Sequence, residues 1–287
     1  LLAQLSASLG KTSAQNELRW MKDALRRTRP VLPPATDLAS MVARRARGEP
    51  LQYILGTQPF GPLELLVRPP VLIPRPETED WVLRLADILH PMCTRPARVL
   101  DLCTGSGCIP LLLCALWPQG STSAVGVDIA DEALTLATDN ARECGVPLLG
   151  DAGAQGPPPR LHNGFLPLHG DLRAPDALAC ALPLKPYTLI TANPPYIPPA
   201  EYAALDASVR DHEDARALLG DGPDGLGFYH AIAELVCADG VLDEDAVLAL
   251  EVGKGQADAV RAIVKRTGAF TRTEVWRDPW GIERVVV

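Results

Sequence analysis

The residues with the clearest chemical potential are the consecutive Asn193, Pro194, Pro195 and Tyr196, which follow the apolar run Tyr187–Ala192. Proline has a fixed φ and no N–H, so we expect the backbone carbonyls here to stay outside helix and ladder and to accept hydrogen bonds. The Asn193 side chain adds an acceptor, and the Tyr196 ring offers an aromatic face. This combination suits a flat NH₂ group, either an amide or the exocyclic amine of a base.

A second unit suited to chemistry is the run 99–109, which predicts a strand, a glycine turn and the start of a helix. Gly105 and Gly107 let the backbone pass close to a ligand, and the helix beyond them offers free N–H groups. The pattern G-x-G-x-x-G is absent, and the strand ends on Asp101, which would repel a pyrophosphate but can pair with an ammonium group. The turn therefore favours S-adenosylmethionine over NAD.

Polar residues also follow the next three strand-like runs. Asp128 stands where a carboxylate binds the ribose hydroxyls in doubly wound nucleotide sites. Asp171 can accept from an adenine amine, and Leu172 can pack on the ring. Because open α/β sheets bind ligands at the rim where their strands end, we expect these residues to share one rim with Asp101 and Asn193.

Each of these residues also has an ordinary structural explanation. A Gly-x-Gly turn can occur without a ligand, Asp128 can cap the helix that begins near Asp131, and Asp171 can be a turn residue. Cys103 and Cys108 can be small core residues rather than reactive thiols. Their occurrence in order, ending in Asn-Pro-Pro-Tyr, is what favours a binding site.

The elements that must position these residues alternate between strand-like and helical runs, which predicts an α/β fold with a mostly parallel, doubly wound sheet. The last two strands have no full helix between them and are expected to form an antiparallel hairpin at one edge. A helix is expected over 78–89, and a flexible Gly/Pro-rich insertion over 148–163. The expected strands are 98–102, 123–128, 165–169, 187–192, 246–252, 270–276 and 282–287.

Two regions precede the sheet. Residues 1–49 carry Leu and Ala at helical spacing and predict a helical domain. Residues 50–74 carry β-prone runs at 52–55 and 63–67, separated by glycine and a proline-containing turn, and predict a β-hairpin linker. Residues 75–287 would then form the main domain.

The composition limits the class of protein. The chain has 287 residues, 47% of them hydrophobic, with a net charge of −8 and a pI near 5.2. This acidic balance argues against tight nonspecific nucleic-acid binding. The longest apolar stretch, 108–117, contains Pro110 and is far too short to span a membrane. Seven cysteines without a C-x-x-C pair favour reduced thiols, and no metal is expected.

These residues resemble the class I S-adenosylmethionine-dependent methyltransferases and, within them, the peptide chain release factor glutamine methyltransferases (the HemK/PrmC family). Three more segments are similar to the narrower family: Glu-Pro-Leu-Gln-Tyr-Ile-Leu-Gly at 49–56, Leu-Ile-Pro-Arg-Pro-Glu-Thr-Glu at 72–79, and the acidic-to-glycine run 211–225. The similarity extends from about residue 48 to the C-terminus. Asn-Pro-Pro-Tyr alone would not distinguish the family from methylases that act on adenine or guanine.

The resemblance implies a seven-stranded Rossmann-like methyltransferase domain behind a helical substrate-recognition domain. It implies methylation of the glutamine amide in the Gly-Gly-Gln loop of a class I release factor, with Asn193, Pro194, Pro195 and Tyr196 holding that glutamine. Taken with the strand-end argument, it gives the expected cofactor-binding residues as Asp101, Cys103, Thr104, Gly105, Ser106, Gly107, Asp128, Asp171, Leu172 and Asn193.

The chain departs from the family pattern in three places. Cys103 stands where glycine is usual, Leu172 often is an aromatic residue in the family, and His-Glu-Asp at 212–214 replaces Tyr-Glu-Pro. The helical domain is also shorter than is usual, and residue 1 is Leu, which indicates that the native start is missing. With the Gly/Pro-rich insertion, this favours the mitochondrial matrix over the cytoplasm.

The chemistry expected of the site follows from the amide nitrogen, a poor nucleophile because its lone pair is delocalised. Hydrogen bonds from both amide N–H groups, to the Asn193 side chain and the Pro194 carbonyl, would orient the amide and stabilise developing positive charge, so no strong base is needed. Two alternatives are N-methylation of a flipped nucleic-acid base and a noncatalytic binding module. The acidic balance argues against the first, and the intact rim argues against the second. We expect a monomer whose partner is a release factor, with no membrane and no stable nucleic-acid binding.

Overall fold

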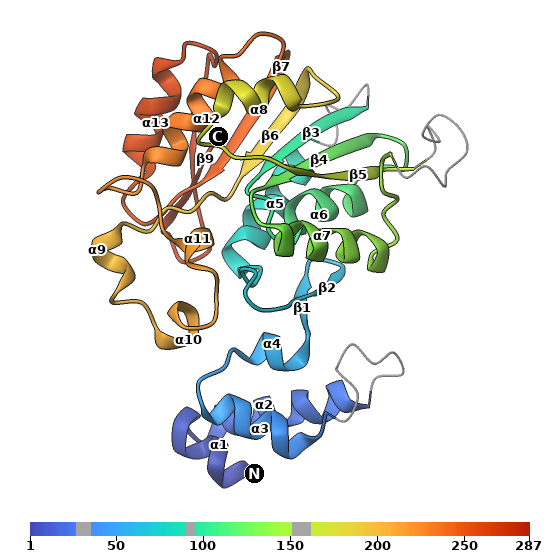
Figure 1. Cartoon of the computed structure of the whole chain (residues 1–287), viewed down its shortest axis with the longest axis vertical. Helices are drawn as coiled ribbons and strands as arrows, with labels where there is room; N and C mark the ends of the chain where they lie inside the picture. The colour runs from blue at the N-terminus through green and yellow to red at the C-terminus, as the bar shows by residue number, and fades with distance from the viewer. Residues whose placement is uncertain (27–35, 90–95, 151–161) are drawn as a thin grey trace.

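The computed structural model of the chain describes residues 1–26, 36–89, 96–150 and 162–287. A mixed sheet forms its centre (Figure 1). The strands of this sheet are β3 (Ala97–Leu102), β4 (Thr122–Asp128), β5 (Gly164–His169), β6 (Tyr187–Ala192), β7 (Leu242–Glu251), β8 (Val275–Arg277) and β9 (Glu283–Val286). Their order is β5-β4-β3-β6-β7-β9-β8.

The direction of these strands agrees with the sequence. β3 to β7 run parallel, β9 is antiparallel to β7, and β8 is antiparallel to β9. The predicted parallel sheet with an antiparallel edge hairpin is therefore confirmed. Two boundaries differ from the prediction: β7 begins at Leu242 rather than 246, and β8 is limited to 275–277 because it pairs only with the short β9.

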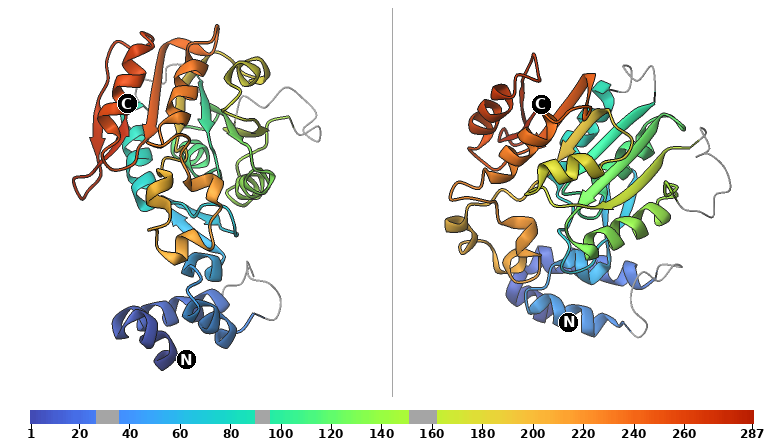
Figure 2. Two further views of the ribbon diagram at one scale, coloured as in Figure 1. Left: turned by 60° about the vertical axis from the view of Figure 1, so that its left-hand side comes forward. Right: turned by 45° about the horizontal axis from the view of Figure 1, so that its top comes forward.

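Helices cover both faces of the sheet (Figures 1 and 2). Val99 and Leu100 are neighbours in β3 and point to opposite faces, yet both are fully buried. Burial on both faces is typical of parallel strands and explains their continuous apolar runs. One face packs on α5 (Pro76–Leu89), α6 (Cys108–Leu116) and α7 (Asp131–Glu143), and the other on α8 (Pro175–Ala181), α12 (Gly227–Val236) and α13 (Ala257–Arg266).

Three short helices lie between β6 and α12. They are α9 (Pro199–Tyr202), α10 (Ala207–Arg210) and α11 (Ala215–Leu218). Within the described part of the chain, none of the helices has both the length and the apolar character that crossing a bilayer requires. Most of the predicted insertion over 148–163 lies outside the described residues.

The N-terminal region is helical, as predicted. Its small core includes Leu5, Met21 and Met41, all fully buried, and it also receives Ile54. In Figures 1 and 2 these helices lie apart from the sheet, beyond the hairpin that follows them. They are α1 (Leu2–Leu9), α2 (Lys11–Leu25), α3 (Leu38–Ala46) and α4 (Leu51–Leu55).

The predicted strand at 52–55 is wrong, because this run forms α4. Pro50 precedes the first turn, and Gly56 ends it in the left-handed region at φ 77°, a start and stop that favour a helix. The predicted hairpin does form, one run later, from β1 (Thr57–Phe60) and β2 (Leu63–Leu66). Packing of Ile54 on the helical core therefore outweighs the β-propensity of the run.

The buried Asn140 side chain bonds the hairpin to a helix that covers the sheet. Asn140 in α7 is fully buried; its Oδ1 accepts from the Leu66 backbone N–H at 2.7 Å. Its Nδ2 donates to the carbonyls of Leu66 at 3.1 Å and Ser106 at 3.0 Å. Asn140 therefore holds β2 and the glycine turn against α7.

We expect Asn140→Ala to lower the free energy of unfolding by about 3 kcal/mol, because it leaves buried backbone groups of Leu66 and Ser106 without partners. Urea unfolding followed by tryptophan fluorescence measures the change. The matched control is Thr138→Ala in the same helix; among the described residues, the Thr138 hydroxyl bonds to the Leu134 carbonyl of its own helix. Its effect should stay below about 0.5 kcal/mol. Equal effects of the two substitutions would contradict the role given to Asn140.

Candidate active site

A cavity of about 370 Å³ opens at the carboxyl ends of β3, β4, β5 and β6. The segments 70–72 and 214–221 form its other walls. Of the residues predicted to bind cofactor or substrate, those that line it are Cys103, Gly105, Asp128, Asp171, Leu172, Asn193 and Pro195.

The glycine turn, 103–107, follows β3 and is held from behind by β4. The Gly105 N–H donates to Asp128 Oδ2 at 2.8 Å, and the Thr104 N–H donates to the Val127 carbonyl at 2.9 Å. Gly105 has φ 55°, and a Cβ added there would meet no atom within 4 Å, so this backbone faces open space. Gly107 has φ 78°, and its Cβ would lie 3.2 Å from Ala137 Cβ. One glycine thus lets a ligand approach, and the other lets α6 pack on α7.

Asp128 both bonds to backbone N–H groups of the rim and lines the cavity. Its Oδ1 accepts from the Ala130 N–H at 3.0 Å, just before α7, and its Oδ2 accepts from Gly105. Burial raises the pKa of Asp128, while these backbone hydrogen bonds oppose that rise. The carboxylate still lines the cavity, and each of its oxygens has a second lone pair. The alternative that Asp128 caps α7 is therefore wrong, because the N-cap is Ala130 and α7 has no side-chain cap hydrogen bond.

Asp101 lies behind the cavity wall, not in it. Its carboxylate is fully buried, and Oδ1 accepts from Thr191 Oγ1 at 2.6 Å. Oδ2 has no hydrogen-bond partner in the described part of the chain, and neither has the buried Thr104 Oγ1. Burial raises the pKa of Asp101 to about 7. Ser106 and Gly107 are likewise buried and do not reach the cavity.

Cys103 adopts a left-handed backbone conformation, with φ 57°, at the point where β3 turns toward α6. L-residues with a Cβ rarely adopt this region. Its side chain lines the cavity, and burial raises the pKa of its thiol well above the usual range, so it stays protonated at neutral pH.

Among the described residues no group of three or more His, Cys, Asp or Glu side chains is placed to hold a metal ion.

The third strand end contributes Asp171 and Leu172. Asp171 forms an ion pair with Arg173 at 2.9 Å and accepts from the Arg173 backbone N–H, also at 2.9 Å. This pairing lowers the pKa of Asp171. The residue is thus a turn residue whose carboxylate also lines the cavity, while Leu172 presents an apolar surface beside it.

Asn193 ends β6 and lies half-buried at the cavity. Its Nδ2 donates to Thr78 Oγ1 at 3.4 Å. Among the described residues, no hydrogen bond uses the backbone carbonyls of Asn193, Pro194 or Pro195, as the missing proline N–H groups predict. The strand end therefore offers a side-chain oxygen and free backbone oxygens close together.

Tyr196 is held by a residue that the sequence reasoning missed. Gln256 Nε2 donates to the Tyr196 carbonyl at 2.9 Å and to the Asp224 carbonyl at 3.0 Å, and its Oε1 accepts from the Gly253 N–H. A Cβ on Gly253 would lie 3.0 Å from Tyr196 Cδ2, so the ring passes close to that backbone. Burial raises the pKa of Tyr196, so its hydroxyl remains protonated at neutral pH.

The two segments that form the other walls are tied together. Arg75 Nη2 donates to the carboxylate of Glu213 at 2.7 and 2.9 Å, and the Asp214 N–H donates to the Pro70 carbonyl at 2.7 Å. The Glu213 side chain is only 1% exposed. A buried carboxylate needs such a partner, and the pairing fixes 70–75 against 213–214.

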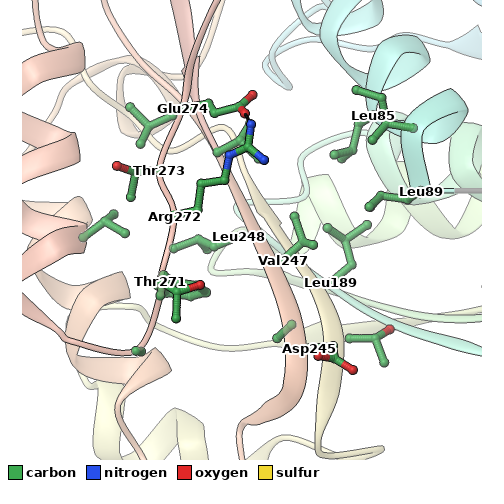
Figure 3. Close-up of a pocket in the computed structure, with 18 of the residues that line it drawn as sticks. Leu85, Leu89, Leu189, Asp245, Val247, Leu248, Thr271, Arg272, Thr273 and Glu274 are labelled. Atoms are coloured by element: carbon green, nitrogen blue, oxygen red, sulfur yellow. Dashed lines mark ion pairs between the residues drawn. The ribbon is translucent and has the colours of Figure 1, made fainter. Parts of the chain in front are cut away.

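A larger hollow, of about 1030 Å³, lies elsewhere (Figure 3). It lies between α5, the first half of β7 and the segment 269–274, where β9 pairs only with the last two residues of β7. Leu85, Leu189 and Val247 give it apolar walls, and Arg272 and Glu274 form an ion pair at its edge. None of the predicted site residues lines it.

The chain is similar to bacterial release factor glutamine methyltransferases. It is 40% identical to the one from Geobacter sulfurreducens over 249 residues, 86% of this chain and 75% of that protein. It is 35% identical to the one from Thermodesulfovibrio yellowstonii over 255 residues, 88% of this chain and 81% of that protein. No family model matches the sequence. A solved structure, human methyltransferase-like protein 13 in complex with SAH, is 18% identical, with 73% of this chain and 80% of that chain covered and a TM-score of 0.46.

We expect Cys103→Gly to be more stable than Cys103→Ala by about 1 kcal/mol, because only glycine adopts φ 57° without strain. Thermal and urea unfolding of the two variants measure the difference. The matched control is the same pair of substitutions at Cys108, the first residue of α6. There the alanine variant should be the more stable one, and the same order at both positions would exclude backbone strain at Cys103.

Proposed function

Because the chain belongs to the release factor glutamine methyltransferase family, we propose that it methylates the glutamine of the Gly-Gly-Gln loop in a class I release factor. The methyl group goes from S-adenosylmethionine to the side-chain amide nitrogen. The observation that supports this most directly is at the end of β6, where Asn193 lines the cavity and the carbonyl of the neighbouring Pro194, which is buried and does not itself line the cavity, accepts no hydrogen bond from the described residues. They form an acceptor site for an NH₂ group.

The cofactor fits the cavity at the rim. Its volume of about 370 Å³ lies within the range of small-molecule sites. Gly105 faces open space, and the Asp128 carboxylate keeps lone pairs for ribose hydroxyls. Leu172 would pack on the adenine, and Asp171 would accept from its amine. Asp101 and Thr104 do not line the cavity, so the predicted pairing of Asp101 with the cofactor's ammonium group finds no support here.

The bound cofactor supplies an electrophilic methyl group on a sulfonium. The protein supplies orientation: Asn193 Oδ1 and the Pro194 carbonyl each accept one amide N–H, which fixes the plane of the glutamine amide and stabilises positive charge on its nitrogen. Pro195 lines the cavity, whereas Tyr196 does not line it in this structure. We propose that the Tyr196 ring packs on the amide plane when the glutamine is bound. The Tyr196 hydroxyl is not the base, because its raised pKa keeps it protonated.

The helical domain, residues 1–49, is proposed to contact the release factor, with 50–74 as the linker and 75–287 as the catalytic domain. In Figures 1 and 2 the segment α9–α11, which follows the carboxyl end of β6, extends toward these helices. A bound factor could therefore touch both. We further propose a monomer without stable nucleic-acid binding. The bacterial relatives reported above give no support to a mitochondrial location.

We expect the purified protein to transfer labelled methyl from S-adenosylmethionine to a class I release factor but not to a variant with Gln→Ala in its Gly-Gly-Gln loop. Asn193→Ala should reduce kcat/KM at least about a hundredfold, as loss of an electrostatic stabiliser does. Total RNA and DNA are tested in parallel. Label on nucleic acid would instead establish base methylation, and label on neither with cofactor bound would contradict the proposed substrate.

We expect Asp128→Ala to raise the Kd for S-adenosylmethionine at least about tenfold, because both a ligand contact and the bond to Gly105 are lost. Calorimetric titration measures it. Asp131→Ala is the matched control, since it removes the same charge from an exposed position at the start of α7. If both variants bind the cofactor equally well, Asp128 does not contact it.

A further inference from the structure

We propose that Thr78 and Glu251 are positioning residues that decide which end of the Asn193 side-chain amide faces the substrate. The inference rests on the proposed function, because it explains how Asn193 comes to present an oxygen to an NH₂ group. It assigns a role to the threonine of the Ile-Pro-Arg-Pro-Glu-Thr-Glu run and to the last residue of β7.

The three side chains form a continuous line of hydrogen bonds. Glu251 is 1% exposed, and its Oε2 accepts from Thr78 Oγ1 at 2.7 Å and from Trp81 Nε1 at 2.8 Å. Thr78 is also 1% exposed, and its Oγ1 accepts from Asn193 Nδ2 at 3.4 Å. The line thus runs from α5 and β7 to the end of β6, and only its Asn193 end reaches the cavity.

The direction of these bonds is fixed by their chemistry. An indole N–H can only donate, so Trp81 requires Glu251 Oε2 to be an acceptor. Burial raises the pKa of Glu251, while the hydrogen bonds from Thr78 and Trp81 and the charge of Arg284 oppose that rise. Both donors favour the carboxylate form, which can only accept. The single hydroxyl hydrogen of Thr78 is then directed to Glu251. Thr78 has only lone pairs left for Asn193, so Asn193 must turn Nδ2 toward it and Oδ1 away from it. Amide orientation is set by such networks.

The position of Glu251 is itself well determined. The Tyr229 hydroxyl donates to the Glu251 backbone carbonyl at 2.8 Å, from α12 on the opposite face of the sheet. Trp81 is 2% exposed and holds the carboxylate from α5. The buried carboxylate is thus held by two donors on one oxygen, Thr78 Oγ1 and Trp81 Nε1, which keeps Oε2 directed at the Thr78 hydroxyl.

The orientation of the Asn193 side-chain amide determines which substrate group can bind to it. With Oδ1 outward, Asn193 accepts from an amide N–H, whereas a carboxylate at the same place would meet oxygen against oxygen. A site whose buried polar groups match one substrate group discriminates strongly against a group that cannot satisfy them. The arrangement therefore favours glutamine over glutamate in the release-factor loop. It does so without any contact between Thr78 or Glu251 and the substrate.

The test compares Thr78→Val, which keeps the shape but removes the hydroxyl, with Thr78→Ser, which restores it. We expect Thr78→Val to lower kcat/KM for the release factor roughly tenfold or more, mostly through kcat, and Thr78→Ser to stay within about threefold of the wild type. The Kd for S-adenosylmethionine should not change in either. Trp81→Phe is the matched control, since it removes the other donor to Glu251 and leaves the Thr78–Asn193 bond.

Trp81→Phe should lower the unfolding temperature at least as much as Thr78→Val and yet retain more activity. An equal loss of kcat/KM in both variants would show that only the packing around Glu251 matters and would overturn the proposal. So would equal activity of the valine and serine variants at position 78.

A second measurement does not depend on turnover. In ¹H–¹⁵N spectra, the Asn193 side-chain NH₂ is identified by its absence in Asn193→Ala. Its hydrogen exchange should be slow in the wild type and Thr78→Ser and faster in Thr78→Val. If the Asn193 side-chain NH₂ exchanges at the same rate in Thr78→Val as in the wild type, the proposed hydrogen-bond line is wrong, even in an active enzyme. Slow exchange of the Asn193 side-chain NH₂ in a wild-type protein that methylates no release factor would support the hydrogen-bond line and contradict the proposed function.

Discussion

The site depends on one constraint: a polar group that is withdrawn from water must find a partner inside the protein. Asn140 satisfies backbone groups of both the hairpin and the glycine turn, and so places the turn against α7. Asp128 satisfies Gly105 and Ala130 and so joins the turn to the next helix. Glu251 draws the hydroxyl of Thr78 and the indole of Trp81 toward the end of β6. Each of these polar groups fixes a segment that lies in the cavity wall or directly behind it.

Much of the fold was predictable because it follows local rules. Strands buried on both faces appear as continuous apolar runs, so β3 to β6 were located to within one residue. The run at 52–55 was predicted wrongly, because its four residues, Gln-Tyr-Ile-Leu, suit either a strand or a helix. The packing of Ile54 on the helical core decides between them. The short β8 was overestimated for a related reason: its length is set by β9, its pairing partner.

The candidate site was predictable to the extent that strand ends meet at one rim. That rule placed Asp128, Asp171 and Asn193 around one cavity. It did not show that Asp101 would be withdrawn behind the wall, since burial depends on what packs beside a strand end. Nor could it find Thr78, Glu251 or Gln256, whose roles rest on hydrogen bonds between residues 60 to 173 positions apart in the sequence. No local pattern encodes such pairs.

The ion pair between Arg75 and Glu213 shows how two separate sequence patterns can be one physical unit. Arg75 belongs to the Ile-Pro-Arg-Pro-Glu-Thr-Glu run and Glu213 to the acidic-to-glycine run, 138 residues later. The flanking residues His212 and Asp214 differ from the family pattern, but the glutamate remains. Removal of one partner would leave a buried charge alone, because the Glu213 side chain is only 1% exposed. The pairing therefore holds 70–75 in contact with 213–214 beside the cavity, where Asp214 also bonds to Pro70 and caps α11.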